Sequence, residues 1–322
     1  MKLLNFVATL GFVVGKQHAL AFAPSSSSSS TKQWQMSNSF QLGPMTPSGK
    51  KFSVSSREQP MAWKKASSAL SMASVESKGE EDEKQFQINP FFATLWLGFL
   101  SYGIAQTASE GVGAGTVSGD ILEQFLANPV NPGVNEIFFV VFNLLGLAPL
   151  VAASLIMPTA KFQKLSATPF LFASAAFGYG ALGPFMSTWV PVEEEKEVTK
   201  SDLGWFTANV LENKLFSTAL SILGASSFVS GGNLIGALAS DAQGTINGFF
   251  DLTSHAAIAL VSTCDLSIIT ITLAYVIYED LILRGEQDKQ KAIAISASSI
   301  LLPIVGAALY CVSRPSLPEK NE

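Results

Sequence analysis

The chain has 322 residues, of which 48% are hydrophobic and only 14% are charged, and its formal net charge is −5. Soluble domains usually carry about 25% charged residues, and the mean hydropathy here is +0.33. This composition argues against a soluble enzyme, a nucleic-acid-binding protein and a disordered chain, and it favours a membrane protein. The two cysteines exclude a disulfide scaffold.

The first 21 residues have the pattern of a signal peptide. Lys2 is followed by the apolar run Leu3 to Val14, which is too short to span a bilayer but has the length of a signal-peptide core. Ala19 and Ala21 then provide the small residues of a cleavage site. We therefore expect residues 1–21 to be a signal peptide.

The next segment, residues 22–77, has the composition of an organelle transit peptide. Between Phe22 and Val75 there are sixteen serines and six basic residues, but the only acidic residue is Glu58. Such a segment cannot bury enough apolar surface to fold alone, so we expect it to be disordered. The composition turns acidic at Glu80, and residues 78–88 are expected to form a linker before a transmembrane helical domain at 89–318.

The junction of these two segments reads Ala19-Leu20-Ala21 followed by Phe22-Ala23-Pro24. This arrangement resembles the bipartite plastid presequence of diatoms and other algae with complex plastids, in which Ala19, Ala21, Phe22 and Pro24 would be the targeting residues. The resemblance implies a plastid membrane, with the thylakoid as first choice and an envelope membrane as second. Twelve of the twenty basic residues and twenty-four of the twenty-five acidic residues follow position 75. A mature chain near −12 excludes nucleic acid as a partner.

The hydropathy of the remaining chain predicts an all-α, polytopic bundle of five or six transmembrane helices, because each helix needs about 20 apolar residues. Five segments meet that requirement, and they are Asn89–Ala108, Val134–Met157, Thr168–Val190, Ser254–Tyr278 and Lys291–Val312. A sixth segment, Lys214–Ser230, is less apolar and rich in Ser and Gly, so it could cross the membrane or lie at its surface.

Loop charges give a conflicting answer on the sixth segment. Basic residues in loops mark one side of a membrane, and they occur at Lys161 and Lys164 and again at Arg284, Lys289 and Lys291. These two loops share a side with five spans and lie on opposite sides with six. Hydropathy favours six, so the sequence leaves the span count open.

Four polar residues are expected within the membrane, and they are Asn143, Asp265, Glu279 and Asp280. An ionisable group in the bilayer is costly and by default suggests a functional site. Asp265 is therefore either a structural hydrogen-bonding residue between helices or a residue that binds a ligand or a proton. Asn143 lies beside Pro149, which frees a backbone carbonyl, so we expect Asn143 to repair the helix or to bind at the break.

His255 is the second candidate catalytic residue after Asp265. It follows Asp251 by four residues, so the two side chains can share a helix face. The pair could form one edge of a metal site, but no Cys/His cluster accompanies it. We therefore expect an interfacial histidine that is hydrogen-bonded by Asp251, with no metal and no cofactor.

Four stretches between about residues 135 and 318 resemble an integral membrane family of cyanobacteria and plastids to which no reaction is assigned. They read FNLLGLAPLVAASLIMP, PFLFASAAFGYGALGPF, CDLSIITITLAYVIYEDLILRG and LLPIVGAALYCVSRPSLPE. A fainter similarity is to the plastid membrane protein required for neoxanthin synthesis in plants. That similarity rests on Asp265-Leu266, on Glu279 or Asp280, and on Pro303.

These observations leave three functional classes. The first is an accessory or assembly factor of the photosynthetic apparatus, with the lipid bilayer, other plastid membrane proteins or pigments as partners. The second is an enzyme on a lipid-soluble substrate such as a carotenoid, with Asp265 and His255 in an apolar pocket. The third is a small transporter. A dry packed interior would favour the first class, an apolar pocket touching Asp265 the second, and a polar passage the third.

Overall fold

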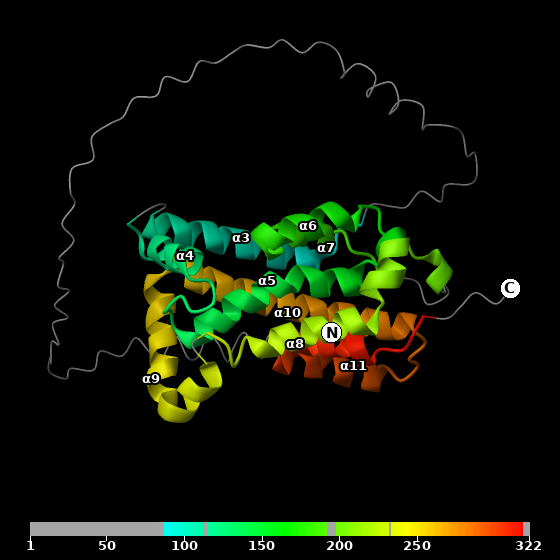
Figure 1. Cartoon of the computed structure of the whole chain (residues 1–322). Helices are drawn as coiled ribbons and strands as arrows, with labels where there is room; N and C mark the ends of the chain where they lie inside the picture. Colours follow the sequence, from blue (N-terminus) through cyan, green and yellow to red (C-terminus); the bar gives the residue numbers. More distant parts are fainter. Residues whose placement is uncertain (1–86, 112–114, 192–197, 232, 318–322) are drawn as a thin grey trace, which may run out of the picture. The chain divides into compact units, whose positions relative to one another are not determined.

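The computed structural model describes residues 87–111, 115–191, 198–231 and 233–317, and within these ranges the chain is all α-helical, without strands. This confirms that the fold is all-α. The predicted signal peptide, the transit peptide and most of the acidic linker lie outside the described residues. The main helices (Figure 1) are α3 (Pro90–Glu110), α4 (Val117–Ala127), α5 (Glu136–Ile156), α6 (Ala167–Phe177), α7 (Tyr179–Met186), α8 (Lys214–Ser226), α9 (Leu234–His255), α10 (Ala257–Leu283), α11 (Lys289–Ser298) and α12 (Val305–Ser313).

Helices α5 and α10 form the centre of the bundle, and α3 packs against α10 and α7. Helix α3 runs antiparallel to α10, because Glu110 at its end contacts Ala257 at the start of α10, and Phe92 near its start packs on Tyr275. Helices α5 and α10 are the two that are long and apolar enough to cross a membrane by themselves. The structure thus supports only two of the five or six predicted spans by length and composition.

The bundle has two ends, which differ in charge. The basic end is where α5, α10 and α12 finish, and it holds Arg284 and Arg314. The acidic end is where α10 begins, and it holds Glu110 and Asp251. Helix α9 lies across the bundle at this acidic end (Figure 1).

The predicted span Thr168–Val190 is wrong, because the structure breaks it at Gly178 into two short antiparallel helices, α6 and α7. The ring of Phe170 in α6 packs on that of Phe185 in α7, and Gln163 exchanges two hydrogen bonds with the backbone of Val190. The chain therefore enters at the basic end, turns at Gly178 and leaves at the same end. We call this element the α6–α7 hairpin.

The predicted span Lys291–Val312 is also wrong, and for the same reason. Helix α11 runs back along α10, as the Ser296 Oγ donates to the Ala274 carbonyl. The chain then turns through a 3₁₀ helix, Ser299–Leu301, and Pro303. Helix α12 returns to the basic end, where the hydroxyl of Tyr310 donates to Asp280.

Helix α8 connects the two ends of the bundle. Its N-cap, Asn213, follows Glu212 at the basic end, and Gly231 beyond its end packs against Phe139 near the start of α5. The weak predicted segment Lys214–Ser230 thus runs from one end to the other, although its helix covers only 13 residues. Helices α4 and α9 lie at the acidic end, where the sequence predicted no element.

This path explains the conflict between loop charges and hydropathy. The loops after α5 and α10 share the basic end, because the α6–α7 hairpin does not change sides and α8 does. Segments that pass through the acidic end, residues 104–136 and 226–257, contain six acidic residues and no lysine or arginine. The two ends therefore differ in lysine and arginine, because the connecting segments at the basic end carry both basic residues and acidic residues such as Glu212 and Glu286.

Candidate functional site: an apolar cleft beside Asp265

A cleft of about 940 Å³ lies beyond the turn of the α6–α7 hairpin. The hairpin fills only the basic half of the space between α3, α5 and α10, so the other half remains open. The cleft is lined by the facing sides of these helices and by the hairpin turn, with Phe99, Gly103, Thr107, Phe142, Gly146, Ser174, Phe177, Gly178, Val261 and Asp265 among its residues.

The walls of the cleft are mostly apolar, and many of the lining residues are Gly or Ala. Two of its lining side chains, Ile104 and Phe177, are 69% and 71% exposed. The cleft therefore opens on an apolar outer surface. Asp265 is the one titratable residue among the described residues that line it.

The helix break at the turn depends on Gly178 and Asp265. Gly178 adopts φ +52° and ψ −134°, a conformation that favours glycine. The N–H of Tyr179, the first residue of α7, donates to Asp265 Oδ1 at 2.8 Å. Asp265 on α10 thus satisfies one of the donors that a helix start leaves free.

The other oxygen of the same carboxylate, Oδ2, makes no hydrogen bond within the described part of the chain. A Cβ atom at position 178 would overlap Oδ2, so only glycine leaves room for it. Asp265 is 8% exposed. One unpartnered carboxylate oxygen is therefore held within an apolar cleft, where an unmade hydrogen bond is costly.

The other polar residues expected within the membrane do not pair with Asp265. Asn143 donates to the carbonyl of Phe139 in its own helix, at 2.8 Å, and does not contact Asp265. Glu279 is half-buried and lies beside Tyr275. The partner of Asp265 is the N–H group of Tyr179, which the helix break at Gly178 leaves free. The sequence did not indicate this break, because residues 168–190 are apolar throughout.

His255 does not join Asp265 in the cleft. It ends α9, its side chain is 67% exposed, and its Nδ1 lies 3.4 Å from Asp251 Oδ1. It contacts Asp251, as the sequence suggested, but the predicted catalytic pair is not assembled. The described residues contain no group of three or more His, Cys, Asp or Glu side chains placed to hold a metal ion.

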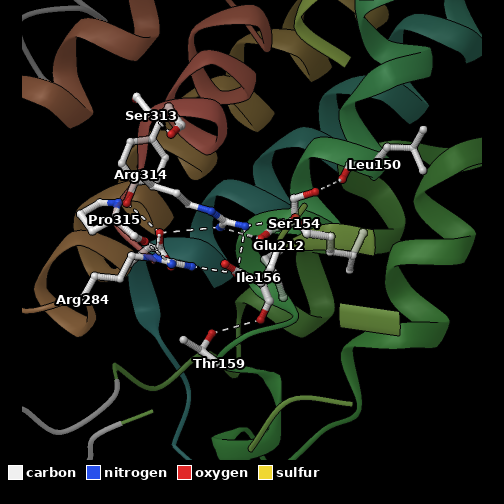
Figure 2. Close-up of polar contacts among 12 residues, drawn as sticks. Leu150, Ser154, Ile156, Thr159, Glu212, Arg284, Ser313, Arg314 and Pro315 are labelled. Carbon is white, nitrogen blue, oxygen red and sulfur yellow. Dashed lines mark hydrogen bonds and ion pairs between the residues drawn. The ribbon is translucent and has the colours of Figure 1, made fainter. Parts of the chain in front are cut away.

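A buried ionic cluster closes the basic end (Figure 2). Arg284 contacts Asp280 through Nε and Glu212 through Nη2, each at 2.8 Å, and Arg314 contacts the same Glu212 oxygen at 2.9 Å. The exposed fractions of these four side chains range from 0 to 11%. Two cations and two anions make the cluster neutral, as buried charges require.

Arg314 also connects the cluster to two other segments. It donates to the carbonyl of Ser154 at 2.9 Å and to that of Leu211 at 3.1 Å. The sequence predicts Arg284 as a loop charge and Asp280 as an intramembrane polar residue. The i, i+4 spacing of Asp280 and Arg284 was an available signal, whereas nothing in the sequence places Arg314 or Glu212 beside them.

A carboxylate joins three helices at the acidic end. Glu110 accepts hydrogen bonds from the Ser118 N–H and hydroxyl, each at 2.6 Å, and from the Ala257 N–H at 2.5 Å. Partial burial raises the pKa of Glu110, but these three hydrogen bonds outweigh that effect and the pKa is lowered. Glu110 thus ties the end of α3 to the starts of α4 and α10.

Comparison with known proteins adds no relative. No family model, no curated protein and no solved structure matches this chain.

Proposed function

We propose that this chain is an integral plastid membrane protein that binds an elongated, lipid-soluble molecule in the Asp265 cleft, as an accessory or assembly factor of the photosynthetic apparatus. The thylakoid is the proposed membrane, with an envelope membrane as the second choice. The observation that carries the proposal is the open apolar cleft with one unpartnered carboxylate oxygen inside it.

The charge asymmetry supports insertion of the bundle across a bilayer. Basic connecting segments stay on the side from which a membrane protein is inserted, and the acidic end has connecting segments without a single lysine or arginine. We propose four crossings, by α3, α5, α8 and α10, with α6–α7 and α11–α12 as re-entrant hairpins. The basic end then faces the stroma.

The hairpin turn supports a binding role for the cleft. Irregular backbone at membrane depth is tolerated only where it is buried in protein or lines a cavity. The break at Gly178 lines the cleft and is held there by Asp265. An opening between exposed apolar side chains suits a molecule that arrives from the lipid phase.

An enzyme acting on a lipid-soluble substrate, such as a carotenoid, is the second candidate, and the position of Asp265 in the cleft favours it. A carboxyl group can transfer a proton to a bound substrate. This candidate relies on Asp265 alone, because His255 lies at the end of α9 and outside the cleft lining.

The test is a pair of glycine substitutions. Gly146 lines the cleft, and a Cβ there would meet nothing within 4 Å; the same holds for Gly98 on α3, which lies outside the cleft. The full chain is purified in lipid nanodiscs, and its lipid-soluble contents are extracted and quantified. We expect a molecule near one per chain in the wild type and in Gly98→Leu, and its loss in Gly146→Leu.

Equal contents in both variants would contradict binding in the cleft. If the wild type converts the extracted molecule to a product and Asp265→Asn retains it unchanged, the enzyme is the correct function. The compartment is tested separately by fusing residues 1–77 to a fluorescent protein, and we expect import into a complex plastid that Phe22→Ala prevents.

A further inference from the structure

We infer that the molecule bound in the cleft is a slender lipid alcohol whose hydroxyl group donates a hydrogen bond to Asp265 Oδ2. This inference rests on the proposed function and specifies the chemical class of the ligand. The cleft offers a long apolar surface and one carboxylate oxygen that has no hydrogen bond within the described part of the chain. An alcohol with a hydrocarbon chain presents the complementary groups.

The position of the two carboxylate oxygens indicates a donor on the ligand. Oδ1 already accepts from the Tyr179 N–H, which belongs to the first residue of α7. This N–H group holds the carboxyl group in place and leaves Oδ2 directed toward the cleft. Oδ2 then has a free lone pair in an apolar site, and a ligand hydroxyl is the simplest neutral donor that satisfies it.

The depth of Asp265 makes this contact selective. Asp265 is eight residues from the start of α10, which is about 12 Å along a helix. A ligand hydroxyl group at this depth loses its hydrogen bonds to water, and a hydrogen-bond partner in the cleft must offset that free-energy cost. Ligands without a donor would leave Oδ2 unpaired, whereas ligands with a donor satisfy both groups at once.

The walls limit the thickness and length of the ligand. Small residues leave the helix backbones near the surface of the cleft. They are Gly103, Ala175, Ala176, Gly146 and Gly180. Along α3 the lining runs from Phe99 to Ala108, which corresponds to about 14 Å, or half the hydrocarbon thickness of a bilayer. A narrow chain, or one end of a longer chain, fits this space better than a bulky headgroup does.

The test compares geranylgeraniol with its methyl ether, which has the same chain but cannot donate. Binding to the full wild-type chain in nanodiscs is measured with labelled geranylgeraniol and by competition with the ether. We expect the alcohol to bind about tenfold more tightly, because the ether leaves a buried acceptor without a hydrogen bond.

Asp265→Asn is the matched variant, because its amide oxygen still accepts from Tyr179 and its NH₂ group donates to either ligand. We expect the preference for the alcohol to disappear in this variant, through a gain in ether binding. Equal binding of the two ligands to the wild type would overturn the inference while leaving the proposed function intact. Failure of both ligands to bind would also overturn the inference, whereas the proposed function is tested by the extracted contents of the wild type and Gly146→Leu. Identical binding of the alcohol to the wild type and to Gly146→Leu would contradict binding in the cleft.

Discussion

Replacement of Arg314 by methionine should destabilise the protein strongly, because the buried ionic cluster then loses its neutrality. The Arg314 side chain is 3% exposed and contacts Glu212 at 2.9 Å. Its removal leaves two carboxylates facing Arg284 alone, and it leaves the carbonyls of Ser154 and Leu211 without this donor. Breaking a buried ion pair from one side typically costs about 3–5 kcal/mol, and we expect Arg314→Met to lower the free energy of unfolding by that amount.

A second substitution should recover part of the loss. Glu212→Gln in the Arg314→Met background restores neutrality, and its amide oxygen can still accept from Arg284. We expect the double variant to be about 1–2 kcal/mol more stable than Arg314→Met alone, in the range of coupling between neighbouring residues. The free energies are measured by reversible unfolding in mixed detergent micelles.

Lys291→Met is the control for the loss of a cation. Lys291 pairs with Glu286, but its side chain is 59% exposed, and exposed pairs contribute little. We expect no measurable change in stability. If Arg314→Met also unfolds like the wild type, or if the double variant is less stable than the single one, the charge-balance argument is refuted.

Three further predictions follow from the breaks and ends of the helices. Gly178→Ala should lower the free energy of unfolding by about 2–4 kcal/mol, because the new Cβ overlaps the Asp265 carboxylate and residue 178 has a positive φ. Gly146→Ala is the control, because a Cβ there meets no atom within 4 Å. It should raise the free energy of unfolding by no more than about 1 kcal/mol, since alanine favours a helix over glycine. Because the pKa of Glu110 is lowered in the folded state, its carboxylate stabilises the fold fully above the unfolded pKa of about 4.3. This contribution is lost as the pH falls through the lower folded-state pKa. The free energy of unfolding of Glu110→Gln, measured against pH, should lack that loss, and a profile like that of the wild type would contradict the assignment. Cysteines introduced at the exposed positions Ser166 and Gln287, without the two native cysteines, should react with an impermeant label from the same side of sealed vesicles, and labelling from opposite sides would refute the re-entrant α6–α7 hairpin.

The sequence alone determined that the fold is all-α. Apolar composition and the length of the apolar runs predicted an all-α fold, and the helices α3, α5 and α10 lie close to where hydropathy placed them. Asn89 and Asn135 cap α3 and α5, as their local sequence permits. These features are local, because hydropathy and capping depend on residues within a few turns of each other.

The tertiary structure decided how the apolar segments are used. Thr168–Val190 is apolar throughout, so its composition could not show that it turns back at Gly178. That turn is stable because Asp265, which is 86 residues away from Tyr179, supplies the acceptor for the first N–H group of α7. The break, the half-length hairpin and the cleft beyond it all depend on this distant contact.

The same distinction applies to the charged residues. The sequence marked Asp265 as a costly group that needs a partner, and this expectation followed from the physics of burial alone. It could not identify the partner, and it could not join Arg314 to Glu212 and Asp280, which are 102 and 34 residues away in the chain. Residue types reveal which groups must be satisfied, but only the packing of the helices decides which groups satisfy them.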